Sequence, residues 1–241
     1  TSTWGGNPVP SASDDVIING GFTVTVDVSN AVCLSVQLGG SVLNSGTGTL
    51  SFNGGSQLTI SGVLNVGPFN SNSTAGSLTM ASGGKLICEG IIVGRLGTWS
   101  SGTGTIELTA TNTLPNDNNV NFNNLTVSGG TTTLSHNVDV NGNIIISTGA
   151  TLNGASNTLS LGGNFTNDGT FTGNTGTVIF VKNGNQSISG TGVNNFNLLR
   201  VNMGTVISNT LEVLSTNFNA PDGFLTLTNG TFKVSGTFTF A

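Results

Sequence analysis

The chain has 241 residues, but only 6% of them are charged, against roughly 25% in an average soluble domain. Five Lys and Arg residues and a net charge of −5 exclude a basic surface for nucleic acid. Long helices and coiled coils are excluded as well, because they need Ala, Glu, Lys and Leu in bulk. Gly (37), Thr (36), Asn (33) and Ser (26) together fill 132 positions, a composition that defines no chemistry by itself.

The chain opens with a segment that differs from the rest. Residues 1–13 contain Trp4, Pro8 and Pro10 and precede the first strand-like run at 16–18. We interpret 1–13 as an N-terminal cap, with Trp4 over the open end of the fold, because terminal coils need a cover. No stretch approaches the roughly 18 apolar residues of a membrane span. The start without Met and without a signal sequence indicates a mature or excised fragment from which any export signal has been removed. We expect an exported protein with an extracellular, cell-surface location.

From residue 16 onwards, apolar residues recur in pairs at i and i+2, which places both side chains on one face of a strand. Clusters of Gly and Asn, such as Asn141-Gly142-Asn143, separate the pairs and permit tight corners. In the second half these expected core residues are Leu125, Val127, Leu134, Val138, Val140, Ile144, Ile146, Leu152, Leu159, Leu161, Phe165, Phe171, Val178, Phe180, Ile188, Phe196, Leu199 and Val201.

Two architectures place short strands this densely. An antiparallel sandwich or barrel has strands at 8–12-residue spacing, and they include longer ones. The expected strands here are very short and their corners are rich in Gly and Asn, which favours a parallel β-helix. We therefore predict an all-β chain, a β-solenoid with about 20–25 residues per coil and roughly eleven coils. Ladders of Asn, Thr and Ser would hydrogen-bond from coil to coil.

A longer repeat overlies the strand pattern. Residues 97–108 match 169–180 at an offset of 72, and 122–127 match 196–201 at an offset of 74. Segment 97–127 therefore resembles 169–201. The last residues, 230–241, are an apolar strand pattern with nothing polar after it. We expect residues 14–241 to form one continuous β-helix that continues beyond residue 241 in the natural chain.

Four segments of the sequence resemble two kinds of known protein. TWGGNPVPSASDDVIINGGFTVTVD (3–27) and LSVQLGGSVLNSGTGTLSF (34–52) resemble the start of an extracellular domain named for eight conserved glycines. FNNLTVSGGTTTLSHNVDVNGNIIIS (122–147) and LSLGGNFTNDGTFTGNTGTVIF (159–180) resemble repeat regions of large Bacteroidota surface proteins. The second resemblance implies an adhesin-like protein exported by the type IX secretion route, with surface glycans or other cell-surface and secretion-system proteins as partners.

Acidic residues are the first candidates for catalysis or metal binding. Those that we considered are Asp14, Asp15, Glu89, Glu107, Asp117, Asp139, Asp168, Glu212 and Asp222. They are spread singly along the chain, although Glu89 and Glu107, 18 positions apart, could adjoin in neighbouring coils. A polysaccharide lyase or hydrolase would need two or more carboxylates in a groove together with Lys85, Arg95 or Lys182. We predict no enzyme and no catalytic, cofactor-binding or metal-binding residue.

Four other residue types have plainer interpretations. Asp14 and Asp15 are expected to cap and solvate a corner. His136, the only histidine, is expected to be an exposed corner residue, because no second ligand accompanies it. Cys33 and Cys88 are expected to be small buried thiols, although a disulfide is possible in an exported chain. Trp99 is expected to point inward, because it aligns with Phe171.

A flat array of threonines on one face of a β-solenoid is an arrangement that binds ice. Thr-x-Thr occurs at 23, 47, 103, 131, 226 and 237, and the gaps between these triplets are not multiples of one coil length. We therefore predict no aligned threonine ladder. The favoured function is a structural or adhesive β-helix, a stalk or rod of a large secreted surface protein. The alternatives are a polysaccharide-active enzyme or glycan-binding module and, more remotely, an ice-binding solenoid.

Overall fold

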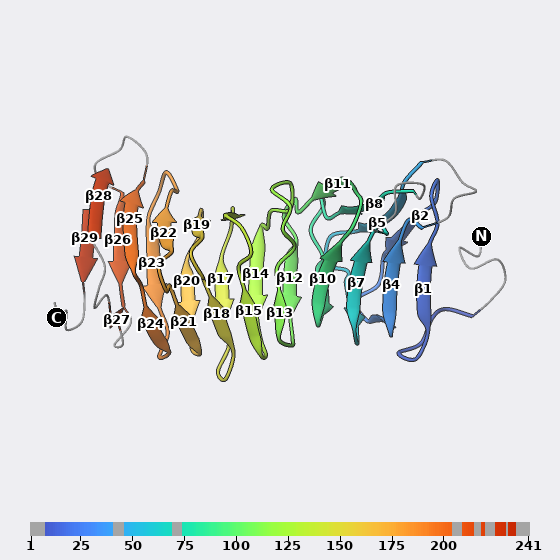
Figure 1. The fold of residues 1–241 in the computed structure, drawn as a ribbon, viewed down its shortest axis with the longest axis horizontal. Coiled ribbons are helices and arrows are strands. Elements are labelled where there is room, and N and C mark those ends of the chain that lie inside the picture. The colour runs from blue at the N-terminus through green and yellow to red at the C-terminus, as the bar shows by residue number, and fades with distance from the viewer. Residues whose placement is uncertain are drawn as a thin grey trace. The chain divides into compact units, whose positions relative to one another are not determined.

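The computed structural model describes residues 8–40, 46–68, 74–203, 209–214, 218–219, 225–229 and 231–234. The chain divides into two compact units, Thr1–Glu107 and Leu108–Ala241. Every element of the described part is a strand, and all of the strand pairs that we compare below are parallel. Within the described part there is no helix of the length and apolar character that a membrane crossing requires. Figure 1 shows the strands of each unit lying side by side as successive rungs.

Unit 1 contains three rows of strands, which we call sheets A, B and C. Sheet A contains β1 (Asp15–Ile18), β4 (Ser35–Leu38), β7 (Val63–Val66) and β10 (Gly90–Val93). Sheet B contains β2 (Thr23–Val26), β5 (Gly48–Phe52), β8 (Gly76–Thr79) and β11 (Leu96–Ser100). Sheet C contains β3 (Ala31–Cys33), β6 (Gln57–Ile60), β9 (Lys85–Cys88) and β12 (Thr105–Leu108).

Unit 2 also contains three rows of strands, which we call sheets D, E and F. Sheet D contains β13 (Asn112–Thr113), β15 (Thr131–Thr133), β18 (Thr151–Asn153), β21 (Thr170–Thr172), β24 (Val193–Asn195) and β27 (Phe218–Asn219). Sheet E contains β16 (Val138–Val140), β19 (Thr158–Leu161), β22 (Thr177–Phe180), β25 (Leu198–Asn202) and β28 (Leu225–Asn229). Sheet F contains β14 (Asn124–Val127), β17 (Ile144–Ile146), β20 (Phe165–Asn167), β23 (Gln186–Ser189), β26 (Thr210–Val213) and β29 (Thr231–Val234).

This arrangement is a β-solenoid, so the predicted fold class is confirmed. The chain makes about nine turns, fewer than the eleven that a uniform 22-residue coil implied. In unit 1, Thr23 pairs with Thr49, 26 positions further on, and Gly48 pairs with Gly76, 28 positions further on. These spacings exceed the expected 20–25 residues per coil. The coil count was too high because corner length varies while the strands remain short.

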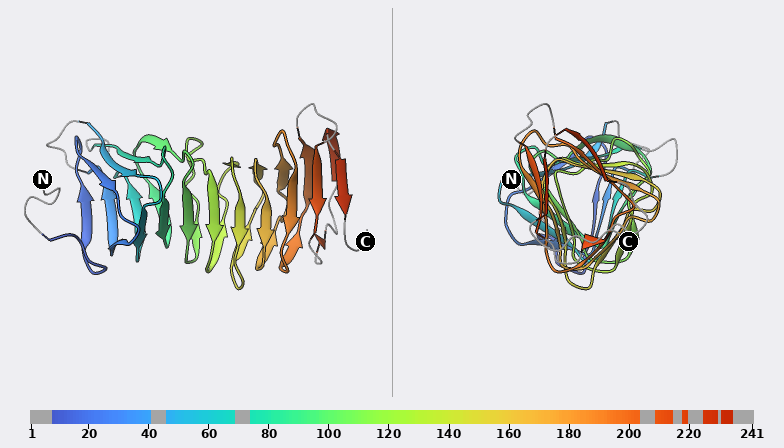
Figure 2. Two further views of the ribbon diagram at one scale, coloured as in Figure 1. Left: turned by 180° about the vertical axis from the view of Figure 1, so that it is seen from behind. Right: turned by 90° about the vertical axis from the view of Figure 1, so that its left-hand side faces the viewer.

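The core of each unit lies between its three sheets. In the end-on view of Figure 2 the strands enclose a central space, which the side chains of alternate residues fill. All 18 core residues expected in the second half are buried. Trp99 is buried as well, with 9% of its surface exposed, which confirms the inward orientation. The cap predicted at Trp4 lies outside the described residues.

Asparagine side chains tie successive coils of unit 2 together at the corner before sheet F. Asn124 Oδ1 accepts the backbone N–H of Asn143 (2.9 Å), and Asn143 Oδ1 accepts that of Asn164 (2.8 Å). Asn164 Oδ1 continues the series with the N–H of Ser187 (3.0 Å). The expected coil-to-coil hydrogen bonding therefore exists, and in this series the bonds run from side chain to backbone. Each bond satisfies a backbone donor where the chain enters the sheet.

Candidate functional site

The structure pairs Glu107 with a lysine instead of a second carboxylate. Lys85 Nζ lies 2.7 Å from Glu107 Oε2, and both residues belong to sheet C. Glu89 follows β9 and is exposed. An ion pair of one carboxylate and one ammonium gives no acid–base couple of the kind that glycoside hydrolysis uses.

The other carboxylates of the described residues have structural partners or are exposed: Glu212 pairs with Lys233 (2.7 Å), and Asp117 Oδ1 accepts the backbone N–H of Asn119 (2.9 Å). Asp168 Oδ1 accepts the backbone N–H of Thr191 (3.0 Å) and its hydroxyl (3.2 Å), as the asparagine side chains do. Asp139 is exposed and lies beside Ser160 in the register of sheet E. Among the described residues, no three His, Cys, Asp or Glu side chains gather into a potential metal site. Asp222 lies outside them.

Asp14 and Asp15 make different contacts at the start of unit 1. Asp14 Oδ2 accepts the hydroxyl (2.7 Å) and the backbone N–H (2.8 Å) of Ser11. These two bonds, the hydroxyl bond first, lower the pKa of Asp14, because both stabilise the carboxylate. Asp15 begins β1, and its carboxylate accepts the hydroxyl of Ser35 on β4. The corner-capping role that we predicted is therefore confirmed for Asp14.

Cys33 and Cys88 are free, buried thiols, as expected. Cys33 pairs with Ile60, and the register of β6 with β9 places Ile60 beside Cys88. The two cysteines are therefore two strand spacings apart, about 9.5 Å, beyond the roughly 7 Å that a disulfide spans between Cα atoms. Burial raises the pKa of Cys33 to about 11 and that of Cys88 to about 12.

His136 is not the exposed corner residue that we predicted. Only 8% of its surface is exposed, because the in–out alternation of β15 continues around the corner through Leu134 and His136 to Val138. Its Nδ1 lies 3.5 Å from the hydroxyl of Ser135. In the described part of the chain its Nε2 is buried without a hydrogen-bond partner. The polar ring is therefore a core component, and a single ring offers no metal-binding set.

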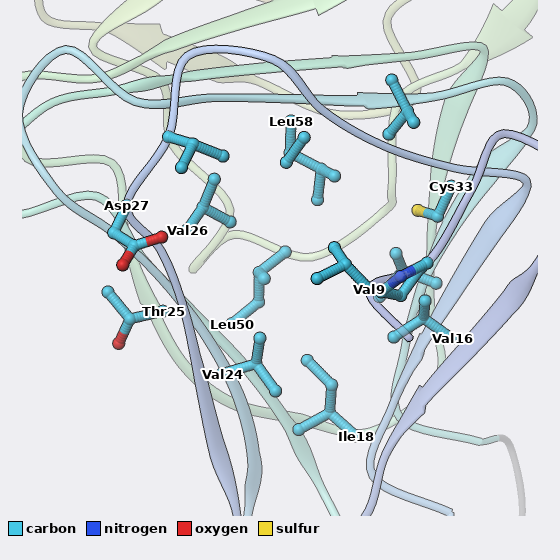
Figure 3. A pocket seen from close by; sticks show the side chains of 15 residues that line it. Val9, Val16, Ile18, Val24, Thr25, Val26, Asp27, Cys33, Leu50 and Leu58 are labelled. Atoms are coloured by element: carbon cyan, nitrogen blue, oxygen red, sulfur yellow. The ribbon is translucent and has the colours of Figure 1, made fainter. Parts of the chain in front are cut away.

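An apolar cavity of about 240 Å³ lies at the β1–β3 end of unit 1 (Figure 3). Its walls come from all three sheets and include Val16, Val26, Cys33 and Leu50. Val9, which is 75% exposed, also lines it. The walls bring few polar groups together, so the cavity lacks the convergent polar atoms that orient a specific ligand.

The most regular surface of the molecule is the outer face of sheet D. Side-chain direction alternates along its strands, so that Leu152 and Phe171 point inward and threonines point outward. Threonine, as a β-branched residue, is favoured on such a pleated surface. The parallel register aligns Thr131, Thr151 and Thr170 in one column, and Thr133, Asn153 and Thr172 in a second. We define the threonine face as Thr113, Thr131, Thr133, Thr151, Asn153, Thr170, Thr172 and Asn195.

Strand geometry sets the dimensions of the threonine face. Neighbouring rungs of a parallel sheet lie about 4.8 Å apart, and outward residues of one strand lie about 6.6 Å apart. Four rungs, β15, β18, β21 and β24, are paired in uninterrupted register. At the last of them Val193 stands in the first column. In the described part of the chain, the hydroxyls of Thr133, Thr151 and Thr172 have no hydrogen-bond partner, so they are available to an outside ligand.

Buried polar side chains hold sheet D in place from behind. Asn167 is fully buried, and its Nδ2 donates to the carbonyl of Val193 (2.8 Å) and to Asn194 Oδ1 (3.0 Å). Its Oδ1 accepts the N–H of Gly169 at the corner before β21. At another corner Gly130 has a φ of +59°, a conformation that favours glycine. The strand ends that carry the outward threonines are therefore fixed by the chain itself.

The prediction that no threonine ladder is aligned is wrong. The coils of sheet D differ in length: Thr131 pairs with Thr151, 20 positions further on, and Thr151 pairs with Thr170, 19 further on. The ladder also includes Thr113 of the triplet 111–113 and both threonines of the triplet 170–172, neither of which is among the six triplets, and it has Asn153 in place of a threonine. Counting the gaps between the six triplets could not reveal it, because only the one at 131 belongs to this face.

The other outer faces are less uniform. On sheet E, Asp139, Ser160, Ile179 and Arg200 share one column. On sheet B, Thr23, Thr49 and Ser77 align, but the irregular pairing of β11 brings the N–H of Thr98 onto the Ser77 hydroxyl, and Ser77 is buried. Sheet D therefore carries an uncharged outward array that is mostly threonine over its paired rungs.

The fold places the chain among the β-solenoid proteins. Comparison with protein-family models, curated proteins and solved structures finds no match. The resemblances of 3–27, 34–52, 122–147 and 159–180 therefore stay predictions, and the function must be argued from the geometry of the chain itself.

Proposed function

We propose that the chain is a non-catalytic adhesive segment of an extracellular protein. It binds to an extended, uncharged surface of another material through the threonine face. The supporting observation is the register that repeats outward Thr and Asn side chains on successive rungs of sheet D. One hydroxyl contributes little, because it exchanges hydrogen bonds to water for similar ones. Many such groups on one rigid element act together, so their weak contacts add up to stable adhesion.

The rigidity of the face supports this role. Threonine is stiff at χ1, and each rung is held by backbone pairing and by buried side chains such as Asn167. Little conformational entropy is then lost on contact, which is the benefit of a pre-organised surface. An uncharged face also suits neutral polysaccharides of the cell surface, whose hydroxyls both donate and accept. We therefore propose surface glycans as partners and an extracellular location.

The test compares two lysine substitutions on unit 2. Thr151→Lys places a hydrated charge in the middle of the threonine face, whereas Thr177→Lys makes the same change on sheet E, where Thr177 also stands in an outward column. We expect the unmodified chain to co-sediment with insoluble cellulose or chitin. Retention should fall roughly tenfold for Thr151→Lys, because the array is split, and should persist for Thr177→Lys.

Circular dichroism and thermal unfolding of both variants show whether the fold is retained. Thr151→Val, which removes the hydroxyl and keeps the shape, provides a milder second variant that should also weaken retention. If Thr151→Lys and Thr177→Lys bind the polymers equally well, the threonine face is not the adhesive surface. If the unmodified chain is retained neither on these polymers nor on ice, the adhesive function itself is wrong.

A further inference from the structure

The geometry of the threonine face points to one specific solid as its ligand: crystalline ice. This inference rests on the proposed adhesive function and names the surface that is bound. Soluble ligands are usually held in concave pockets with a few convergent polar groups. The threonine face instead offers a two-dimensional lattice of outward side chains, most of them threonine, with spacings of about 4.8 Å by about 6.6 Å. Such a lattice is complementary to a surface that is itself periodic in two directions, as planes of ice are.

The chemistry of the side chains fits the same ligand. Each threonine presents a hydroxyl, which can stand in a water network as donor or acceptor, beside a methyl group, around which water becomes ordered. Thr133, Thr151 and Thr172 have no partner for these hydroxyls in the described part of the chain, so their bonds are made to water. Asn153 is different, because its Oδ1 already accepts Nδ2 of Asn174 (2.6 Å).

The absence of charge on the face matters for ice in particular. Asp, Glu, Lys and Arg hold hydration shells whose geometry differs from that of the ice lattice, and burying such a charge against a neutral solid is costly. None of them stands at an outward position of sheet D between Thr131 and Asn195. The sheet E column that contains Asp139 and Arg200 is expected to stay in contact with liquid water.

The test grows ice slowly from a solution of the full 241-residue chain and measures how much protein enters the ice, together with thermal hysteresis. We expect the chain to be incorporated and Thr151→Lys to be excluded, with hysteresis lowered roughly tenfold. Thr177→Lys should behave as the unmodified chain does. Thr151→Ser, which keeps the hydroxyl and removes the methyl group, should weaken ice binding while it preserves retention on cellulose or chitin.

The outcomes separate the two proposals. If ice excludes the unmodified chain while polysaccharides retain it through the threonine face, ice is the wrong ligand and the adhesive function stands. If neither ice nor polysaccharide retains the chain, both proposals fail. If the chain enters ice but Thr151→Lys does so equally well, the threonine face is not the ice-binding surface. Unfolding measurements on each variant exclude loss of fold as the cause.

Discussion

Replacing Phe171 by alanine is expected to lower the free energy of unfolding by about 3–5 kcal/mol. Phe171 is fully buried. Its ring centroid lies 5.3 Å from that of Phe165, at an interplanar angle of 82°, and 5.0 Å from that of Phe196. Because backbone hydrogen bonds fix the spacing of the rungs on either side, the cavity cannot collapse, and the loss should fall near the upper end of the range.

Phe22→Ala provides the matched control, since it makes the same chemical change at a side chain that is 61% exposed. Its cost should be within about 0.5 kcal/mol. Urea unfolding of the two variants measures the difference. Equal destabilisation by both would contradict the core assignment. Phe171 alternates with Thr170 and Thr172 on β21, so the same cavity would lie directly behind the threonine face and should also weaken adhesion.

Stability is expected to fall steeply as the pH rises from about 9 to about 12, because of the two buried thiols. Desolvation is the first cause of both raised pKa values, and the nearby carboxylates of Asp15 and Glu89 add to it. In the unfolded chain the thiols lose their protons near pH 9, while the folded chain still holds them. The unfolded state then binds fewer protons, so the free energy of unfolding decreases with pH. Each thiol contributes on the order of 1 kcal/mol per pH unit within its window.

Cys33 lowers the stability between pH 9 and about pH 11, and Cys88 lowers it between pH 9 and about pH 12. The smaller shift of Cys33 agrees with its place on the wall of the unit 1 cavity, where fewer atoms surround it. The chain has no Tyr, which removes one source of alkaline titration. Urea unfolding of a Cys33→Ala/Cys88→Ala double variant at several pH values tests whether the two thiols cause this loss of stability. If the free energy of unfolding of the double variant falls above pH 9 as steeply as that of the unmodified chain, the two thiols are not the cause.

The sequence was sufficient to predict the core but not the register. Pairs such as Leu159 and Leu161 mark inward positions directly, because side-chain direction alternates along a strand, and they are buried. Which strands lie side by side depends on corner length, and corners tolerate insertions. The coil from Thr170 to Val193 is 23 residues long, whereas the two coils before it have 20 and 19 residues. No local sequence pattern indicates the longer coil.

Corner conformation and register also explain why the burial of His136 and the threonine face were not predicted from the sequence. His136 lies in a turn-like stretch, and turns are usually exposed, yet the alternation of β15 passes through this corner and buries it. The threonine face exists only because the strands of sheet D, each from a different coil, are paired at equivalent positions. A search for identical triplets at one period misses it, because Asn153 replaces a threonine and the spacing is not constant.

The most direct test of the account is a footprint of the bound chain. Thr172→Cys and Thr177→Cys each add one outward thiol, on sheet D and sheet E respectively, while the buried native thiols with their raised pKa values react slowly with maleimide. On ice or on the polysaccharide that retains the chain, the account predicts that the thiol at 172 is protected and the thiol at 177 is labelled. Equal labelling of both thiols, or protection of the thiol at 177 alone, would contradict it.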